Sequence, residues 1–135
     1  MDKLKDLKVG LIGLGHMGKP MAHNLHLAGA NVTVSNRSKS PISELVAKGL
    51  KGVNTPREVA NVSDLVILMV TDTEAVNDVL HGTNGLISDN LSKKFIIDMG
   101  TTKVYETRQW AKEIADKGGH FIDAPVSGGQ VGAET

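Results

Sequence analysis

The sequence contains no cysteine, which excludes a disulfide scaffold and a metal site built on thiolates. Aromatic residues make up only 3% of the 135 residues, so the core has to be built from aliphatic side chains and methionine. No apolar run approaches the roughly 20 residues that a membrane-spanning helix requires. The polar segment Met1–Lys5 lacks the apolar core of a signal peptide. We therefore expect one globular domain in the cytoplasm.

An excess of charge of one sign is also missing, because 15 Lys and Arg residues balance 15 Asp and Glu residues. This balance argues against nucleic acid or a membrane surface as a partner. The histidines do not suggest a metal site. His23 and His26 are three residues apart on one predicted helix, and no third ligand accompanies them.

Short apolar runs alternate along the chain with stretches of helical periodicity, which is typical of a parallel sheet covered by helices. Strands are predicted at Lys8–Ile12, Asn31–Ser35, Leu65–Val70, Phe95–Met99 and His120–Ile122, with a short edge strand at Lys51–Val53. Because the crossovers of such sheets are right-handed, the pattern predicts a doubly wound α/β sheet with strand order 3-2-1-4-5-6. A ligand should bind at the switch point between the first and fourth strands.

Helices are predicted between these strands, at Met17–Gly29, Ser40–Gly49, Pro56–Asn61, Glu74–Leu80 and Lys103–Lys117. In the first of them, Met17, Met21 and Leu25 recur at helical spacing and form an apolar stripe. In the second, Ser40 is the expected N-cap and Pro41 the first helical residue. Glycines end both helices.

A glycine loop, Gly13-Leu14-Gly15-His16-Met17-Gly18, connects the first strand to the first helix. Gly13 permits a tight turn, Gly15 lets a pyrophosphate approach the backbone, and Gly18 lets the helix pack closely. The N–H groups and the positive dipole end of the helix favour an anion there. The loop therefore predicts a Rossmann-type dinucleotide-binding domain, with these six residues at the pyrophosphate.

The second strand ends in Asn36-Arg37-Ser38, where NAD-binding domains place an acidic residue on the ribose hydroxyls. A carboxylate would repel a 2′-phosphate, whereas Asn36 can donate a hydrogen bond and Arg37 can make a forked, charge-assisted contact. Ser38 adds a hydroxyl. The segment predicts NADP in preference to NAD, the alternative being a polar turn before the next helix.

Two further loops follow strands at the same edge of the predicted sheet. Val70-Thr71 stands at the end of the fourth strand, and Thr101, after the fifth, is expected to contact the cofactor or to cap the next helix. Ser127-Gly128-Gly129 follows the last strand and offers a hydroxyl and two unobstructed N–H groups. Such a nest suits a small carboxylate, although on composition alone it is also an ordinary glycine-rich turn.

Together, the glycine loop, Asn36-Arg37, the segment Asp98-Met-Gly-Thr-Thr102 and the segment Asp123-Ala-Pro-Val-Ser-Gly-Gly129 resemble the β-hydroxyacid dehydrogenase family. This family includes 3-hydroxyisobutyrate dehydrogenase and reductases of tartronate, glyoxylate and succinic semialdehydes, and it is related to 6-phosphogluconate dehydrogenase. The resemblance implies the NADP-preferring branch. It also implies cofactor contacts from Val70, Thr71 and Thr101, and a substrate-carboxylate loop at Ser127–Gly129.

The family's catalytic lysine and all-helical second domain have no counterpart in this sequence. Lys103, Lys112 and Lys117 do not occupy the matching position, and the resemblance places the lysine beyond Thr135. We therefore expect a domain that binds NADP(H) and turns over little. The parent protein should be a homo-oligomer, and this chain is compatible with a monomer. A non-catalytic dinucleotide-binding module and an imine reductase-related domain stay open as alternatives.

Overall fold

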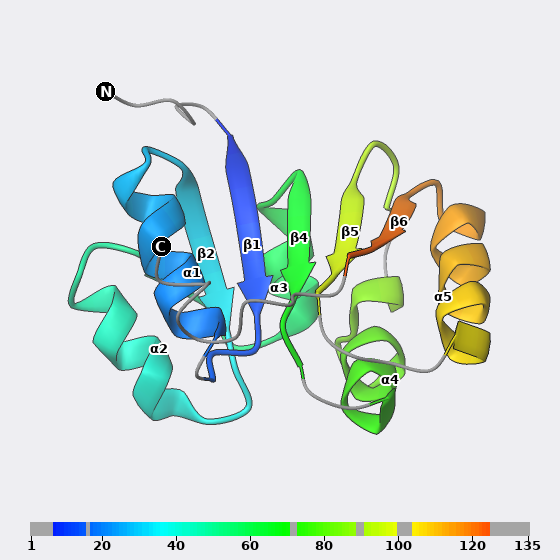
Figure 1. The fold of residues 1–135 in the computed structure, drawn as a ribbon, viewed down its shortest axis with the longest axis horizontal. Coiled ribbons are helices and arrows are strands. Elements are labelled where there is room, and N and C mark those ends of the chain that lie inside the picture. Colours follow the sequence, from blue (N-terminus) through cyan, green and yellow to red (C-terminus); the bar gives the residue numbers. More distant parts are fainter. Residues whose placement is uncertain (1–6, 16, 71–72, 89–90, 100–103, 125–135) are drawn as a thin grey trace.

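A computed structural model describes residues 7–15, 17–70, 73–88, 91–99 and 104–124, which form a six-stranded parallel sheet (Figure 1). Its strands are β1 (Lys8–Ile12), β2 (Asn31–Ser35), β3 (Lys51–Gly52), β4 (Leu65–Leu68), β5 (Phe95–Asp98) and β6 (His120–Asp123). Their order is β3-β2-β1-β4-β5-β6, and neighbouring strands run parallel. The predicted fold class and strand order are therefore confirmed.

Helices cover the sheet on both sides (Figure 1). They are α1 (Gly18–Leu27), α2 (Lys39–Val46), α3 (Pro56–Asn61), α4 (Thr73–His81) and α5 (Val104–Asp116), with a short 3-10 helix at Leu86–Ser88. Side chains of α1 and α2 share one apolar cluster with the sheet, and side chains of α3, α4 and α5 share the other. Of the helices that are described, none has the length and apolar character needed to cross a membrane.

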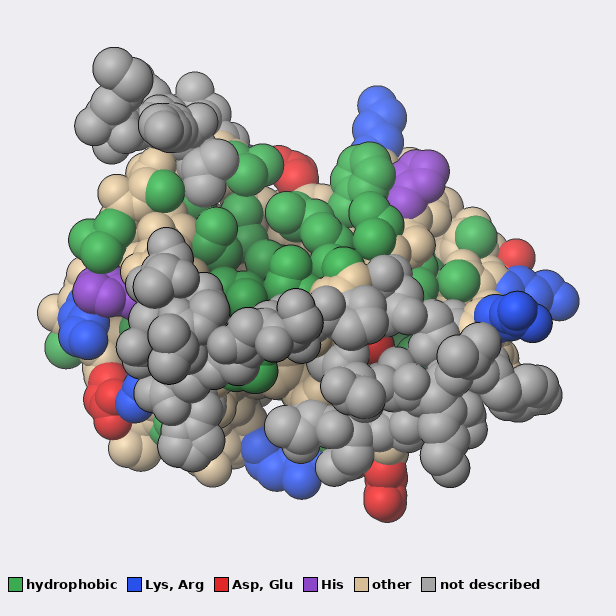
Figure 2. Space-filling view, in the orientation of Figure 1, with side chains coloured by type: hydrophobic (Ala, Val, Ile, Leu, Met, Phe, Trp, Pro, Cys, Tyr) green, Lys and Arg blue, Asp and Glu red, His purple; other side chains and the backbone are tan. Residues whose placement is uncertain are grey.

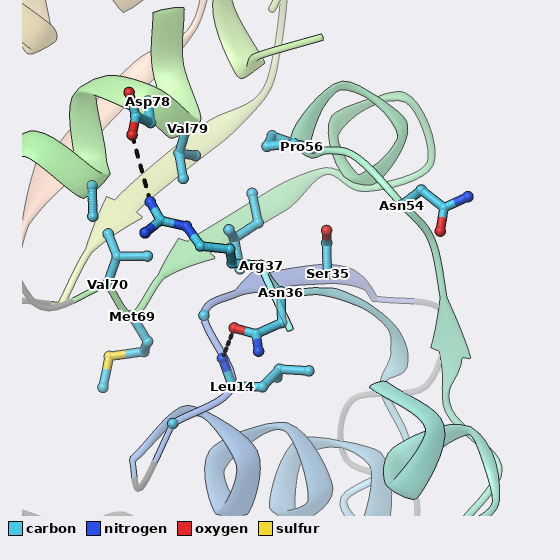
Figure 3. Close-up of a pocket in the computed structure, with 14 residues that line it drawn as sticks. Leu14, Ser35, Asn36, Arg37, Asn54, Pro56, Met69, Val70, Asp78 and Val79 are labelled. Atoms are coloured by element: carbon cyan, nitrogen blue, oxygen red, sulfur yellow. Dashed lines mark hydrogen bonds and ion pairs between the residues drawn. The ribbon is translucent and has the colours of Figure 1, made fainter. Parts of the chain in front are cut away.

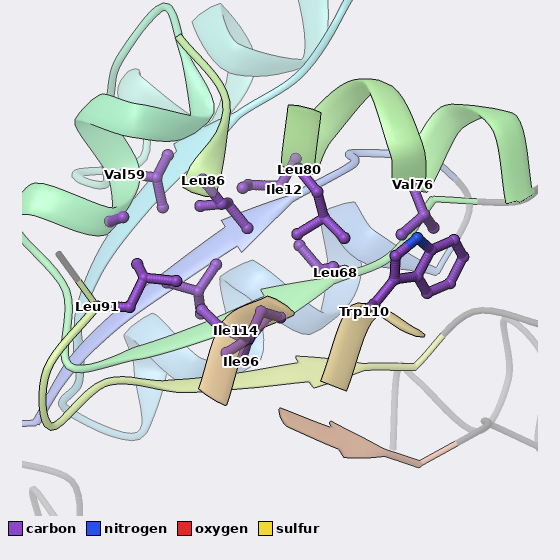
Figure 4. Packing of buried hydrophobic residues seen from close by; sticks show 12 residues of the cluster. Ile12, Val59, Leu68, Val76, Leu80, Leu86, Leu91, Ile96, Trp110 and Ile114 are labelled. Carbon is purple, nitrogen blue, oxygen red and sulfur yellow. The ribbon is translucent and has the colours of Figure 1, made fainter. Parts of the chain in front are cut away.

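The cluster behind β1, β4 and β5 holds α4 and α5 in place (Figure 4). Trp110 of α5 is 2% exposed and lies beside Val76 of α4. Its indole N–H donates to Oδ1 of Asn77 over 2.7 Å, and Nε2 of His81 lies 2.8 Å from Oε2 of Glu113 between the same two helices. Each large apolar side chain buried here contributes roughly 1.5–3 kcal/mol, and the polar contacts fix how α4 sits against α5.

On the opposite face, α1 packs closely against the sheet through the buried residues Gly18 and Ala22. An ion pair of 2.7 Å from Lys19 to Glu44 joins α1 to α2, and this hydrogen bond and charge hold the pKa of Glu44 below its ordinary value. Phe95 of β5 and Ile122 of β6 are each 44% exposed. Figure 2 shows apolar side chains over this part of the sheet.

Three helices, α1, α2 and α5, end in the same glycine-dependent turn. Gly29, Gly49 and Gly118 have φ angles of 100°, 102° and 87°, in the left-handed region that favours glycine. In each turn the next residue's N–H donates to the carbonyl five residues back, as from Ala30 to Leu25 over 3.1 Å. The predicted helix ends at Gly29 and Gly49 are confirmed.

Several predicted boundaries are wrong: β3 and β5 end one residue earlier than predicted, β6 ends one residue later, and α4 is one residue longer at each end. Two larger differences have a clear structural cause. The second helix, α2, begins at Lys39 after an extended Ser38, so Ser40 is not its N-cap and Pro41 is the third helical residue. A proline is tolerated there because the first four N–H groups of a helix have no partner within it. Strand β4 ends at Leu68 instead of Val70. Its neighbour β1 turns away at Gly13, which leaves β4 without a ladder partner on that side.

Candidate cofactor-binding site

A cleft of about 400 Å³ opens at the carboxyl ends of β1, β2 and β4, which is the predicted switch point (Figure 3). The described residues that line it are Ile12, Gly13, Leu14, Gly15, Ser35, Asn36, Arg37, Asn54, Pro56, Met69, Val70, Ala75, Asp78 and Val79. The ends of β1 and β2 form one wall, and the segment after β4 together with α4 forms the other.

The glycine loop is held tightly against its surroundings. Gly13 has a φ angle of 101°, and a Cβ atom there would lie 2.5 Å from the carbonyl oxygen of Met69. Its N–H donates to the carbonyl of Ser35 over 3.1 Å, which ties the loop to the end of β2. A Cβ atom on Gly18 would collide with the carbonyl oxygen of Gly13. Both positions therefore require glycine, as the sequence predicts.

Gly15 differs from the other two glycines because its Cβ position faces open space. Apart from its chain neighbours, no described atom lies within 4 Å of that position. The space lies at the N-terminus of α1, whose N-cap residue Met17 makes no side-chain cap and whose described first turn carries no acidic residue. The unneutralised helix end, equivalent to about half a positive charge, favours an anionic ligand there. The loop therefore fits a pyrophosphate.

Asn36 connects the glycine loop to the end of β2. Its Oδ1 accepts a hydrogen bond from the Leu14 N–H over 2.9 Å, and its Nδ2 donates to the Ser38 carbonyl over 3.1 Å (Figure 3). The amide thus fixes both segments through one side chain. The prediction treated Asn36 as a ligand of the cofactor, and this contact to the loop was missed.

Arg37 reaches across the cleft from the end of β2 to α4 (Figure 3). Its Nη2 lies 3.5 Å from Oδ2 of Asp78, and the two side chains are 80% and 66% exposed. Among the described residues that line the cleft, these two are the only ones with ionisable side chains. The electrostatic character of this part of the cleft therefore depends on one exposed pair.

The structure brings together about half of the predicted cofactor residues. Gly13, Leu14, Gly15, Asn36, Arg37 and Val70 line the cleft. Leu14 contributes its backbone, because its side chain is buried in the core. Met17 and Gly18 belong to the glycine loop and Ser38 precedes α2, and none of these three is among the residues that line the cleft. The remaining predictions lie outside the described residues: His16, Thr71, Thr101, Ser127, Gly128 and Gly129.

Several lining residues were missed by the sequence analysis, namely Asn54, Pro56, Met69, Ala75, Asp78 and Val79. Asn54 and Pro56 follow β3 at the carboxyl edge of the sheet, so their position could have signalled a role. Within the described part of the chain, no group of three or more His, Asp or Glu residues is arranged to hold a metal ion.

A glycine loop between a parallel strand and a helix, at the switch point of a doubly wound sheet, defines the class of Rossmann-type dinucleotide-binding domains. The sequence family of the NAD binding domain of 6-phosphogluconate dehydrogenase matches residues 8–135, and the chain belongs to this family. The relationship that the motifs imply is thereby confirmed.

Similar proteins include oxidoreductases of hydroxy acids. The chain is 43% identical over 128 residues to 2-hydroxy-3-oxopropionate reductase of Escherichia coli (strain K12), covering 94% of this chain and 43% of that protein. It superposes on 3-hydroxyisobutyrate dehydrogenase from Salmonella typhimurium with a TM-score of 0.87 at 28% identity, covering 96% and 45% of the two chains. An imine reductase from Pseudomonas sp. gives a TM-score of 0.84 at 32% identity, covering 93% and 43%. The chain thus spans less than half the length of these relatives.

Proposed function

We propose that this chain is the NADP(H)-binding domain of an oxidoreductase similar to 3-hydroxyisobutyrate dehydrogenase. The parent enzyme would transfer a hydride between NADP and a small 3-hydroxy acid or aldehyde acid. The observation that carries the proposal is the cleft itself, in which Gly15 faces open space and Asn36 and Arg37 stand where NAD-binding domains place an acid after β2.

The cofactor would supply the redox chemistry, and the residues of this chain would bind and orient it. The loop from Gly13 to Gly18 and the N-terminus of α1 would hold the pyrophosphate. The adenosine ribose then falls at the end of β2, where Arg37 would contact the 2′-phosphate with its charged fork. Asn36 supports this arrangement through the Leu14 N–H, and we assign Ser38 to the same phosphate.

The substrate would be a small carboxylate bound by Ser127, Gly128 and Gly129. Val70, Thr71 and Thr101 would contact the cofactor beside it. The support is the family relationship together with a 43% identical relative named for a hydroxy-oxo acid. We further propose a cytoplasmic homo-oligomer for the parent enzyme, with no nucleic-acid or membrane partner.

We expect this chain to bind cofactor without appreciable turnover. Proton transfer to the substrate requires a general acid or base within hydrogen-bond reach. Arg37 and Asp78 are the only ionisable side chains among the described residues that line the cleft. Both lie where the adenosine would bind. The lysine that the family resemblance implies would have to come from a segment beyond Thr135.

An imine reductase-related domain is the second candidate. It is favoured by the 32% identity and the TM-score of 0.84 to the Pseudomonas enzyme. The hydroxyacid assignment is preferred because the Escherichia coli reductase is 43% identical over nearly the same share of the chain. A non-catalytic binding module would keep the same cleft, and detectable substrate binding to the NADP-saturated chain would argue against it.

Calorimetric titrations of the chain with NADPH and NADH test the cofactor assignment. The wild-type chain should bind NADPH more tightly than NADH. Arg37→Ala should lower the affinity for NADPH by about 10- to 100-fold, because it removes charge-assisted hydrogen bonds worth about 1.5–3 kcal/mol. The affinity of Arg37→Ala for NADH should differ from that of the wild-type chain by less than about twofold. Arg108→Ala, the same substitution at an exposed residue of α5 away from the cleft, is the matched control. Equal losses for both cofactors in Arg37→Ala would refute the NADP assignment.

A further inference from the structure

Among the described residues that line the cleft, Asp78 carries the one acidic side chain. We propose that Asp78 is a specificity-determining residue, whose carboxylate competes with the cofactor's 2′-phosphate for Arg37 and so lowers the preference for NADP(H) over NAD(H). This inference rests on the proposed function, because it assumes that Arg37 is the 2′-phosphate contact. It adds a residue on the opposite wall of the cleft that no part of the dinucleotide motif contains.

The pair spans the two walls of the cleft. Arg37 follows β2 and Asp78 lies on α4, 41 residues later in the chain, yet their charged atoms are 3.5 Å apart. Figure 3 shows the arginine side chain extended toward the carboxylate. The guanidinium therefore points at Asp78.

The charges make competition unavoidable once a phosphate occupies the end of β2. A 2′-phosphate carries negative charge, so it is attracted to Arg37 and repelled by the Asp78 carboxylate beside it. Forked binding of a phosphate also uses two N–H groups of the guanidinium. Since Nη2 is the atom that faces Asp78, a phosphate bound to the fork has to share this nitrogen with the carboxylate or displace the carboxylate from it.

Exposure sets the size of the effect. With 80% and 66% of the two side chains exposed, solvent screens the pair and it contributes little to stability. The cofactor can therefore open it, and Asp78 adjusts the preference without abolishing NADP binding. NAD-binding domains have an acidic residue at the end of β2 that holds the ribose. In this cleft the acidic residue lies on α4 instead, where it would weaken the contact between Arg37 and the 2′-phosphate.

The test compares Asp78→Asn with Glu74→Gln in titrations with NADPH and NADH. Both substitutions remove one negative charge from α4, but Glu74 is exposed and does not line the cleft. Asp78→Asn should increase the affinity for NADPH by about threefold and change the affinity for NADH by less than about 1.5-fold. Glu74→Gln should leave the ratio of the two affinities unchanged. In an Arg37→Ala background, the gain from Asp78→Asn should shrink.

An unchanged or lower NADPH preference in Asp78→Asn overturns the inference, and so does an equal gain from Glu74→Gln. The proposed function is judged separately, by the wild-type chain and Arg37→Ala. If Arg37→Ala removes the NADPH preference while Asp78→Asn has no effect, only the role of Asp78 is refuted. If the wild-type chain shows no NADPH preference for Arg37→Ala to remove, the NADP assignment fails and this inference fails with it.

Discussion

The inner end of the cleft, formed by the glycine loop and Asn36, differs from its outer end, formed by Arg37 and Asp78. At the inner end, Gly13 and Leu14 are buried and their N–H groups donate to groups at the end of β2 over 3.1 Å and 2.9 Å. At the outer end, two exposed side chains meet at 3.5 Å. We expect the inner end to determine whether a dinucleotide binds and the outer end to determine which one.

A methyl group added inside the loop should disturb the inner end of the cleft most. The Cβ atom of Gly18→Ala would collide with the Gly13 carbonyl, a backbone atom that cannot easily move. The expected cost is about 1–3 kcal/mol of unfolding free energy, with loss of affinity for both cofactors. Thermal unfolding and calorimetric titration measure the two effects.

Gly15→Ala is the matched control, because the same methyl group enters open space there. It should leave the melting temperature unchanged and weaken both cofactors by about tenfold, since the methyl group occupies the place of the pyrophosphate. If Gly18→Ala were as stable as the wild-type chain, the close contact between loop and helix would not be the reason for glycine at this position.

Substitutions at Asn36 test whether this residue acts through the glycine loop at the inner end or on the 2′-phosphate at the outer end. Asn36→Ala leaves the Leu14 N–H without its acceptor, and the expected loss is about 1–2 kcal/mol of stability with an equal weakening of NADPH and NADH. Asn36→Asp keeps an oxygen acceptor, so its stability should stay near that of the wild-type chain. Its negative charge should nevertheless favour NADH over NADPH.

Thermal unfolding and titrations with both cofactors decide between these outcomes. If Asn36→Ala weakened NADPH alone, the side chain would act on the 2′-phosphate and not through the loop. If Asn36→Asp were as unstable as Asn36→Ala, hydrogen bonding through Oδ1 would not explain the role of the residue.

Sequence patterns predicted the sheet well because strand periodicity, crossover handedness and glycine turns are local or topological rules. The bounds of β1 and β2 and the strand order are confirmed. The start of α2 was misplaced because Ser38 and Ser40 are both plausible caps, and only the backbone conformation distinguishes them. The end of β4 depends on its neighbour β1, which a pattern within β4 does not contain.

The dinucleotide-binding motif predicted the wall of the cleft formed by the ends of β1 and β2, but not the wall formed by α4. Ala75, Asp78 and Val79 follow the i, i+3, i+4 spacing of one helix face, but spacing does not say that this face borders the cleft. The contact between Arg37 and Asp78 joins residues 41 positions apart. Likewise, the residue type of Asn36 allowed either a phosphate contact or a loop contact.

The smallest expected effect tests whether the outer end depends on how α4 is anchored. Asn77→Ala removes the acceptor of the Trp110 indole N–H and should cost about 1 kcal/mol of stability. The ratio of NADPH to NADH affinity should stay unchanged, because Asp78 remains on the same helix. Asn77→Asp, which keeps an oxygen acceptor, should recover most of the stability in thermal unfolding. A changed ratio in Asn77→Ala would show that the packing of α4 controls the cleft.

Trp110 is the one tryptophan of the sequence, and it is buried against α4, the helix that forms one wall of the cleft. Its emission therefore reports from a single known place. The emission band of a buried indole overlaps the absorption band of a reduced nicotinamide ring, whereas the oxidised ring does not absorb there. Quenching of Trp110 by energy transfer would thus register a bound reduced cofactor without any label, and the oxidised cofactors would provide the reference.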